Sequence, residues 1–286
     1  MRKHLLLIVA ICSINLSFSQ IYFSSSIGQT IGSAEVKFGE IVTPSQSENS
    51  YGSYGEGTNF QLRAGYFFNE TFGVDFGIAY LHGADQTITK VSLSNQEINA
   101  IARARAFGLS PSLVYKFSNK IYGRFGALIK AGGKTEAVVY NKTSFSDSEA
   151  SAQGLPSGSY SVTEYTEDYH GVLPLGFVGA FGYKLDFNKN FGLFIEAEYL
   201  GISVKRKDSE ISEFNTNIML PDGTVAVSSL YSLENLPTGY VIKSDYVDEL
   251  PHNNTDPSKK LAQRVPYSSF GINFGITCTF EQKVSK

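Results

Sequence analysis

The chain has 286 residues, a formal net charge of −3 and 42% hydrophobic residues, and only 18% of its residues are charged. Such a low charged fraction excludes an intrinsically disordered chain and a coiled coil. Two cysteines are too few for a disulfide-stapled fold, and the sequence carries no basic block of the kind that binds nucleic acid, so nucleic acid is not an expected partner.

Residues 1–19 have the pattern of a secretory signal peptide. Arg2, Lys3 and His4 precede an apolar run from Leu5 to Ile14, and Ser17 to Ser19 supply a small-x-small cleavage site. A run of about ten apolar residues matches a signal peptide and is too short for a membrane-spanning helix. We therefore expect an exported mature chain comprising residues 20–286.

The mature chain contains eight segments in which large apolar residues alternate with small or polar ones. Strict alternation places successive side chains on opposite faces and predicts β-strands. In the last segment, Phe270, Ile272, Phe274 and Ile276 alternate with glycine, asparagine and threonine. In chain order the predicted strands are 21–31, 60–68, 72–80, 107–117, 121–131, 173–185, 191–201 and 270–280.

The connections between these strands alternate between short and long. The short ones, 69–70, 118–120 and 186–190, contain Asn, Asp or Ser, which favour tight turns. The expected long loops are 33–57, 83–101, 133–170 and 203–264. Residues 220–224 predict a hairpin, either above the membrane or as a fifth transmembrane pair that would make ten strands; residues 215–227 lack a full apolar face, which favours eight.

The two faces of these strands distinguish a membrane barrel from a soluble one. One face is large and apolar, whereas the other carries Gly, Ala, Ser and Thr, which suit the narrow interior of an eight-stranded barrel. A water-facing surface would carry many Lys and Glu residues. Aromatic residues at the short-turn end match an interfacial girdle: Phe68, Phe72, Phe117, Phe187, Phe191 and Phe280. The prediction is an all-β, antiparallel, up-and-down transmembrane barrel with short periplasmic turns and long extracellular loops.

These strands and turns, with the final strand 270–280 ending in an aromatic residue, resemble small outer-membrane β-barrels of the OmpA/OmpX type, in the outer-membrane β-barrel domain family. The resemblance covers nearly the whole mature chain. It implies location in the cell outer membrane, contact with its lipid and lipopolysaccharide, and recognition of the last strand by the barrel-insertion machinery. We expect a monomer without a cofactor.

Ionisable residues in the inward phase predict a charge network inside the barrel. Ions in a narrow lumen must pair, because an unpaired buried charge costs several kcal/mol. The structural interpretation is a static plug of ion pairs, and the functional one is a charge-selective conduit. The predicted lumen residues are Arg63, Asp75, Lys116, Arg124, Lys130, Lys184, Glu196 and Glu198.

A second set of basic residues shares the outward phase at the loop end of the strands. They are interpreted either as ordinary charges at the membrane rim or as contacts for lipopolysaccharide phosphates. The residues are Arg103, Arg105, Lys205, Lys207 and Arg264.

No residue pattern predicts catalysis or a metal site. His82 and His170 have aspartates nearby in sequence, but no nucleophile motif accompanies them, and the acidic residues of 245–256 are better explained as a solvated loop. The favoured function is therefore a non-enzymatic barrel with a packed lumen and a structural or surface-interaction role. The alternatives are a narrow small-solute channel and, less favoured, a rim-active enzyme.

Overall fold

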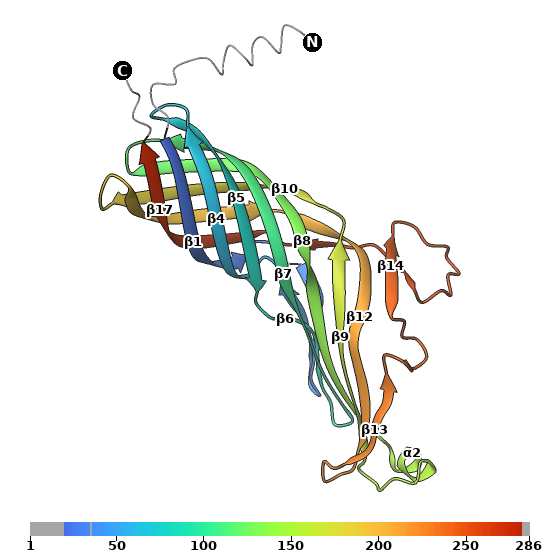
Figure 1. The fold of residues 1–286 in the computed structure, drawn as a ribbon. Helices are drawn as coiled ribbons and strands as arrows, with labels where there is room; N and C mark the ends of the chain where they lie inside the picture. Colours follow the sequence, from blue (N-terminus) through green and yellow to red (C-terminus); the bar gives the residue numbers. More distant parts are fainter. Residues whose placement is uncertain (1–19, 35, 282–286) are drawn as a thin grey trace, which may run out of the picture.

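A computed structural model describes residues 20–34 and 36–281, and the predicted signal peptide lies outside these residues. The described residues form an all-β fold with one short helix, which confirms the all-β prediction (Figure 1). The elements are β1 (Gln20–Gly32), β2 (Val36–Val42), β3 (Ser47–Gly52), β4 (Gly57–Phe67), β5 (Phe72–Gly83), β6 (Gln86–Ser92), β7 (Gln96–Lys116), β8 (Ile121–Ser144), α2 (Asp147–Ala152), β9 (Tyr160–Gly171), β10 (Leu175–Asp186), β11 (Phe191–Gly201), β12 (Ser203–Met219), β13 (Val225–Ser232), β14 (Lys243–Val247), β15 (Lys259–Leu261), β16 (Arg264–Pro266) and β17 (Ser269–Glu281).

Eight antiparallel strands pair into a closed ring. The order is β1, β4, β5, β7, β8, β10, β11 and β17, and β17 pairs back onto β1. Each predicted strand segment forms one member of this ring. Ile27 of β1, for example, lies opposite Phe60 of β4 and Phe274 of β17, so the apolar phases of neighbouring strands are in register.

Short turns close one end of the ring, as the sequence predicted. The Asn69 side chain accepts hydrogen bonds from the backbone amides of Thr71 and Phe72 at 2.9 and 2.8 Å. Asn188 does the same for Asn190 and Phe191, at 2.9 Å each. These Asx turns fix the short connections between β4 and β5 and between β10 and β11. We call this end of the ring the turn end.

The prediction of long loops at the other end is wrong in detail, because most of those residues form strands. β7 and β8 continue past the ring, and β9 and β12 extend the sheet on one side while β6, β2 and β3 extend it on the other. We call this region the extension; it projects from the ring and ends near β13 and α2 (Figure 1). The 220–224 turn joins β12 to β13, which pairs with β12 and with no ring strand among the described residues.

A β-bulge marks the place where β7 and β8 leave the ring. The register shifts between Phe107 and Gly108, so that the extra residue lies on β8. Gly133 follows with φ of +91°, and a Cβ there would lie 1.9 Å from the carbonyl oxygen of Arg105. Only glycine meets both demands, and the bulge bends the sheet where ring becomes extension.

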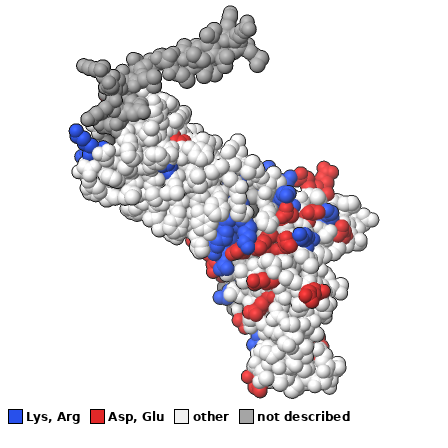
Figure 2. Space-filling view, viewed as in Figure 1, with Lys and Arg blue, Asp and Glu red and all other residues white. Residues whose placement is uncertain are grey.

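The ring has an apolar outer face and a small, polar inner face. Phe125 is 63% exposed and Leu113 is 65% exposed, although both lie in the middle of strands. Ser24, Gln61 and Thr277, which point inward, are buried. In the space-filling view the ring wall is almost free of charged side chains, whereas the extension carries many (Figure 2). Among the described residues, no helix is long and apolar enough to cross a membrane.

Candidate functional site

Four buried ionisable side chains meet across the middle of the ring. Arg63 of β4 donates from Nη1 to both carboxylate oxygens of Glu196, at 2.9 Å each. Arg124 of β8 donates from Nη2 to Glu196 at 3.1 Å and also to Glu198. All four residues are at most 6% exposed. We call these four residues the ion layer.

Hydrogen bonds from uncharged side chains complete the ion layer. The Tyr122 hydroxyl donates to Glu196 Oε2 at 2.9 Å, and Gln61 Nε2 donates to Glu198 Oε1 at 2.7 Å. Tyr122 has room because Gly182 lies beside it, where a Cβ would come within 2.2 Å of the tyrosine ring. Glu196 therefore accepts from three side chains, as a buried carboxylate requires.

The other predicted lumen residues lie outside the ion layer. Asp75 accepts a hydrogen bond from the Tyr22 hydroxyl at 3.1 Å. Lys184 pairs with Asp186 at 2.9 Å at the turn end, and Lys130 donates to the carbonyl of Gly133 at 3.3 Å. Lys116 donates to Gln20 Oε1 at 3.0 Å. The structure thus brings together four of the eight predicted residues.

Sequence reasoning missed the tyrosines that accompany these charges. Tyr22 and Tyr122 each fill the space above a glycine on the neighbouring strand, Gly65 and Gly182 respectively. The only sequence signal is a glycine in the inward phase. Without the strand register, that glycine does not reveal which tyrosine fills the space.

Two small cavities flank the ion layer. The turn-end cavity measures about 60 Å³, and its lining includes Arg63 and Asp75. The second, about 70 Å³, is lined by Gln61, Glu198 and Tyr267 among others, on the extension side. Each has room for a few water molecules at most.

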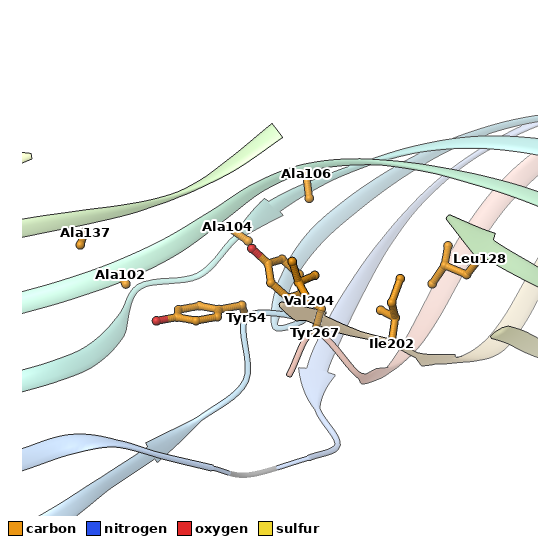
Figure 3. Close-up of a cluster of buried hydrophobic side chains, with 9 residues drawn as sticks. All are labelled: Tyr54, Ala102, Ala104, Ala106, Leu128, Ala137, Ile202, Val204 and Tyr267. Atoms are coloured by element: carbon orange, nitrogen blue, oxygen red, sulfur yellow. The ribbon is translucent and has the colours of Figure 1, made fainter. Parts of the chain in front are cut away.

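An apolar cluster covers the extension side of the lumen. Tyr54 and Tyr267 lie close together with their ring centroids 5.7 Å apart (Figure 3). The Tyr267 hydroxyl forms a hydrogen bond with that of Thr135. Alanines of β7 and β8 and branched side chains of β8, β12 and the β11–β12 junction pack around them: Ala102, Ala104, Ala106, Ala137, Leu128, Ile202 and Val204. The ion layer and this cluster thus lie at two levels along the ring.

The outward basic residues lie where the extension leaves the ring. Arg103 donates to Glu136 at 3.1 Å and lies 3.6 Å from Asp85, while Arg105 donates to the carbonyls of Gly83 and Ala104 at 2.9 Å. Lys134 bridges Glu136 and Asp168 at 3.0 and 2.9 Å. We call Arg103, Arg105 and Lys134 the collar cations.

Burial alone would raise the pKa of Glu136, but hydrogen bonds from Lys134 and Arg103 outweigh it and hold that pKa below its usual value. Carboxylates thus already compensate part of the charge of the collar cations.

Of the other basic residues predicted to contact lipopolysaccharide, Lys205 pairs with Asp248 at 2.6 Å and Lys207 with Asp208 at 3.2 Å. Arg264 is exposed and lies opposite Lys205 in the β12–β16 pairing.

His170 and the nearby aspartates that could have formed a catalytic or metal site have other partners. His170 Nδ1 lies 2.8 Å from Asp208, while Asp168 binds Lys134 and Asp85 lies near Arg103. In the acidic segment, Asp245 pairs with Lys259 at 2.5 Å. Within the described part of the chain, no group of three His, Cys, Asp or Glu residues is placed to hold a metal ion.

Comparison with known proteins gives no family for this chain. No family model matches, and no curated protein matches. Among solved structures, a Pseudomonas aeruginosa FadL homologue is similar over 92% of this chain and 90% of its own, with 10% identity and a TM-score of 0.24.

Two structures of TodX are also similar. A mutant described as a monoaromatic hydrocarbon channel has 11% identity and a TM-score of 0.22, covering 96% of this chain and 93% of its own. The Pseudomonas putida toluene transporter TodX has 8% identity and a TM-score of 0.19, covering 94% and 91%. None of the three is described as an enzyme or as an OmpA- or OmpX-type barrel. At these scores we derive neither family nor substrate from them.

Proposed function

We propose that this is an integral outer-membrane protein whose closed strand ring is an eight-stranded transmembrane β-barrel. The observation that carries the proposal is the outer face of the ring, where exposed Phe, Leu and Ile side chains follow one another on all eight strands. A continuous apolar surface of this extent is unfavourable in water and suits contact with lipid hydrocarbon. Closure leaves no unpaired strand edge in the lipid, which membrane-spanning sheets require.

The turn end is assigned to the periplasm and the extension to the outside of the cell. Short periplasmic turns and long extracellular segments are the usual arrangement in outer-membrane barrels. An exposed aromatic row at the turn end supports this assignment, because aromatic side chains favour the membrane interface: Phe68, Phe72, Phe117, Phe187, Phe191 and Phe280. The proposal includes recognition of β17 by the barrel-insertion machinery, and a monomeric state.

The proposed role is structural and surface-interacting, without catalysis. The ion layer and the apolar cluster obstruct the lumen, while the extension presents a long sheet beyond the membrane. Tyr165 stacks on Phe214, with centroids 5.7 Å apart, and Phe214 also contacts Tyr240, so aromatic side chains pack on this sheet. A packed projecting sheet is suited to contact with other molecules at the cell surface.

A narrow small-solute channel is the second candidate, favoured by the two cavities on either side of the ion layer. Purified protein in planar bilayers separates the two. A plugged barrel is expected to give no resolvable unitary conductance. Reproducible ohmic steps whose ion selectivity changes in Glu196→Gln would contradict the plug and establish the channel.

We also propose that the collar cations contact lipopolysaccharide phosphates. A surface depression is lined by the basic side chains of Arg105 and Lys134 together with Tyr80, Phe107 and His170. Its aromatic residues, Tyr80 and Phe107, continue the apolar outer face of the ring. Its basic residues lie where the lipid headgroups of the outer leaflet would begin. Arginine binds phosphate in a bidentate manner, which supports this placement.

We expect Arg103→Ala combined with Arg105→Ala to weaken lipopolysaccharide association about tenfold or more, because two charge-assisted contacts are lost. Lysine at both positions is expected to restore only part of it. Titration of the purified variants with lipopolysaccharide measures the effect, and Lys243→Ala, an exposed cation on β14, is the control. Unchanged binding by the double variant would show that the collar cations serve only the ion pairs with Asp85 and Glu136.

A further inference from the structure

The turn-end cavity is lined by an excess of basic side chains. Lys116, Lys120, Lys184 and Arg63 face one carboxylate, Asp75. Arg63 is neutralised by Glu196 and Lys184 by Asp186. Lys116 and Lys120 have no carboxylate within 4.0 Å among the described residues. The cavity therefore carries positive charge that its own walls do not balance.

Lys116 is the central cation of this cavity. Its Nζ donates to Gln20 and lies 3.7 Å from the centre of the Phe67 ring, so the ring face and one amide oxygen are its only described partners. Phe67 is itself buried. An ammonium group has three donors, so two remain available for a ligand. A cation–π contact offsets only part of the cost of partly burying an uncompensated charge.

The other walls define what kind of ligand fits. Hydroxyl groups from Tyr22, Tyr122, Thr277 and Thr279 line the cavity beside the apolar Val114 and Phe194. The Thr277 and Thr279 hydroxyls can donate to an anion, whereas the Tyr22 and Tyr122 hydroxyls already donate to Asp75 and Glu196. Asp75 at the inner end repels an anion. An anionic group would therefore lie toward the turn end, near Lys116 and Lys184. A volume of about 60 Å³ has room for a phosphate or carboxylate group.

We propose that the turn-end cavity is a binding site for one phosphate or carboxylate group, held mainly by Lys116. The site is defined by the cavity itself and does not depend on the proposed membrane placement. That placement bears only on the source of the anion, which is either a small anion in solution or a phospholipid headgroup at the turn end.

Phosphate and acetate titrations of the folded protein in nonionic detergent, followed by calorimetry, test the site. We expect Lys116→Met to weaken phosphate or acetate binding about tenfold or more, because a charge-assisted hydrogen bond is lost while the apolar stem remains. Lys184→Met should weaken binding less, since Asp186 already engages that cation. Lys189→Met is the matched control: this lysine lies in the β10–β11 turn but does not line the cavity.

Mixed micelles containing phosphatidylglycerol distinguish the sources. Tighter binding of the lipid than of phosphate, lost in Lys116→Met, would assign the site to a headgroup; phosphate or acetate binding alone would assign it to a soluble anion. Both outcomes support the site. It is overturned if neither anion nor the lipid binds at millimolar concentration, or if Lys116→Met binds as the wild type does while its folded band on unheated gels is unchanged.

Discussion

Replacement of Glu196 by alanine is expected to lower the free energy of unfolding by about 3–5 kcal/mol, the usual cost of removing one partner from a buried ion pair. Glu196 is completely buried and binds Arg63, Arg124 and Tyr122. Without it, Arg124 keeps Glu198, but Arg63 keeps only a long hydrogen bond of 3.4 Å to Ser24 and a contact with the Phe194 ring, and no described carboxylate within 4.0 Å. An arginine cannot lose its proton to escape this cost, so the whole penalty falls on the folded state.

Urea unfolding of the protein in lipid vesicles, followed by the migration of unheated samples on gels, measures this loss. Asp186→Ala is the control, because its pair with Lys184 is partly exposed and such pairs contribute about 0.2–1 kcal/mol. If the alanine variant does not assemble, Glu196→Gln keeps part of the hydrogen bonding and should show a smaller loss. A loss below that of Asp186→Ala would mean that water screens the ion layer and that the lumen is open.

Leu113→Arg is expected to destabilise the barrel by about 2–4 kcal/mol, although the leucine side chain is already 65% exposed. Leu113 lies midway along the ring part of β7, between Phe107 and Phe117. On a water-exposed surface this substitution would be close to neutral. In the middle of a bilayer, the guanidinium must leave water or deform the lipid.

The same unfolding assay provides the measurement, and Val225→Arg provides the control. Val225 is also exposed and apolar, but it lies on β13 at the end of the extension, where arginine should change stability little. A large loss at position 113 with none at position 225 is the expected pattern. Equal, small effects at both positions would mean that the ring wall faces water.

The ring strands were predictable because their signals are local. Alternation of large apolar with small residues specifies both the strand and its two faces, and Asn69 and Asn188 specify their turns within four residues. All eight predicted segments lie in ring strands, with ends within a few residues except where β7 and β8 continue into the extension.

The extension was not predictable on the same basis. Its inner positions on β7 are Ala100, Ala102 and Ala104, and its outer positions include Arg103 and Arg105. Neither face therefore has the continuous row of large apolar residues that marks the ring strands. β9 and β12 form a sheet only by pairing with each other and with β8 across long sequence separations. From composition alone, the residues of the extension are therefore predicted to form loops.

The ion layer was predictable in part. Counting residues from the turns places Arg63 and Glu196 at similar heights, and the structure joins them. The same counting places Lys130 near Glu198, but Lys130 donates to the Gly133 carbonyl instead, because the bulge beside it turns β8 toward the extension. The contributions of Tyr22, Tyr122 and Gln61 depend on strand register and on glycine-lined spaces, which a single sequence does not specify.

The central claim is that the outer face of the ring contacts lipid hydrocarbon. It is tested most directly by nitroxide labels placed one at a time along β17 of the protein in lipid vesicles. Each label is attached to a single introduced cysteine, in a chain whose two own cysteines are replaced by serine. At positions 270, 272, 274 and 276, we expect high collision rates with oxygen and low rates with a water-soluble nickel chelate. At positions 273 and 277, which point inward, both rates should be low. High nickel collision rates at the even positions would contradict the claim and identify the ring as a soluble barrel.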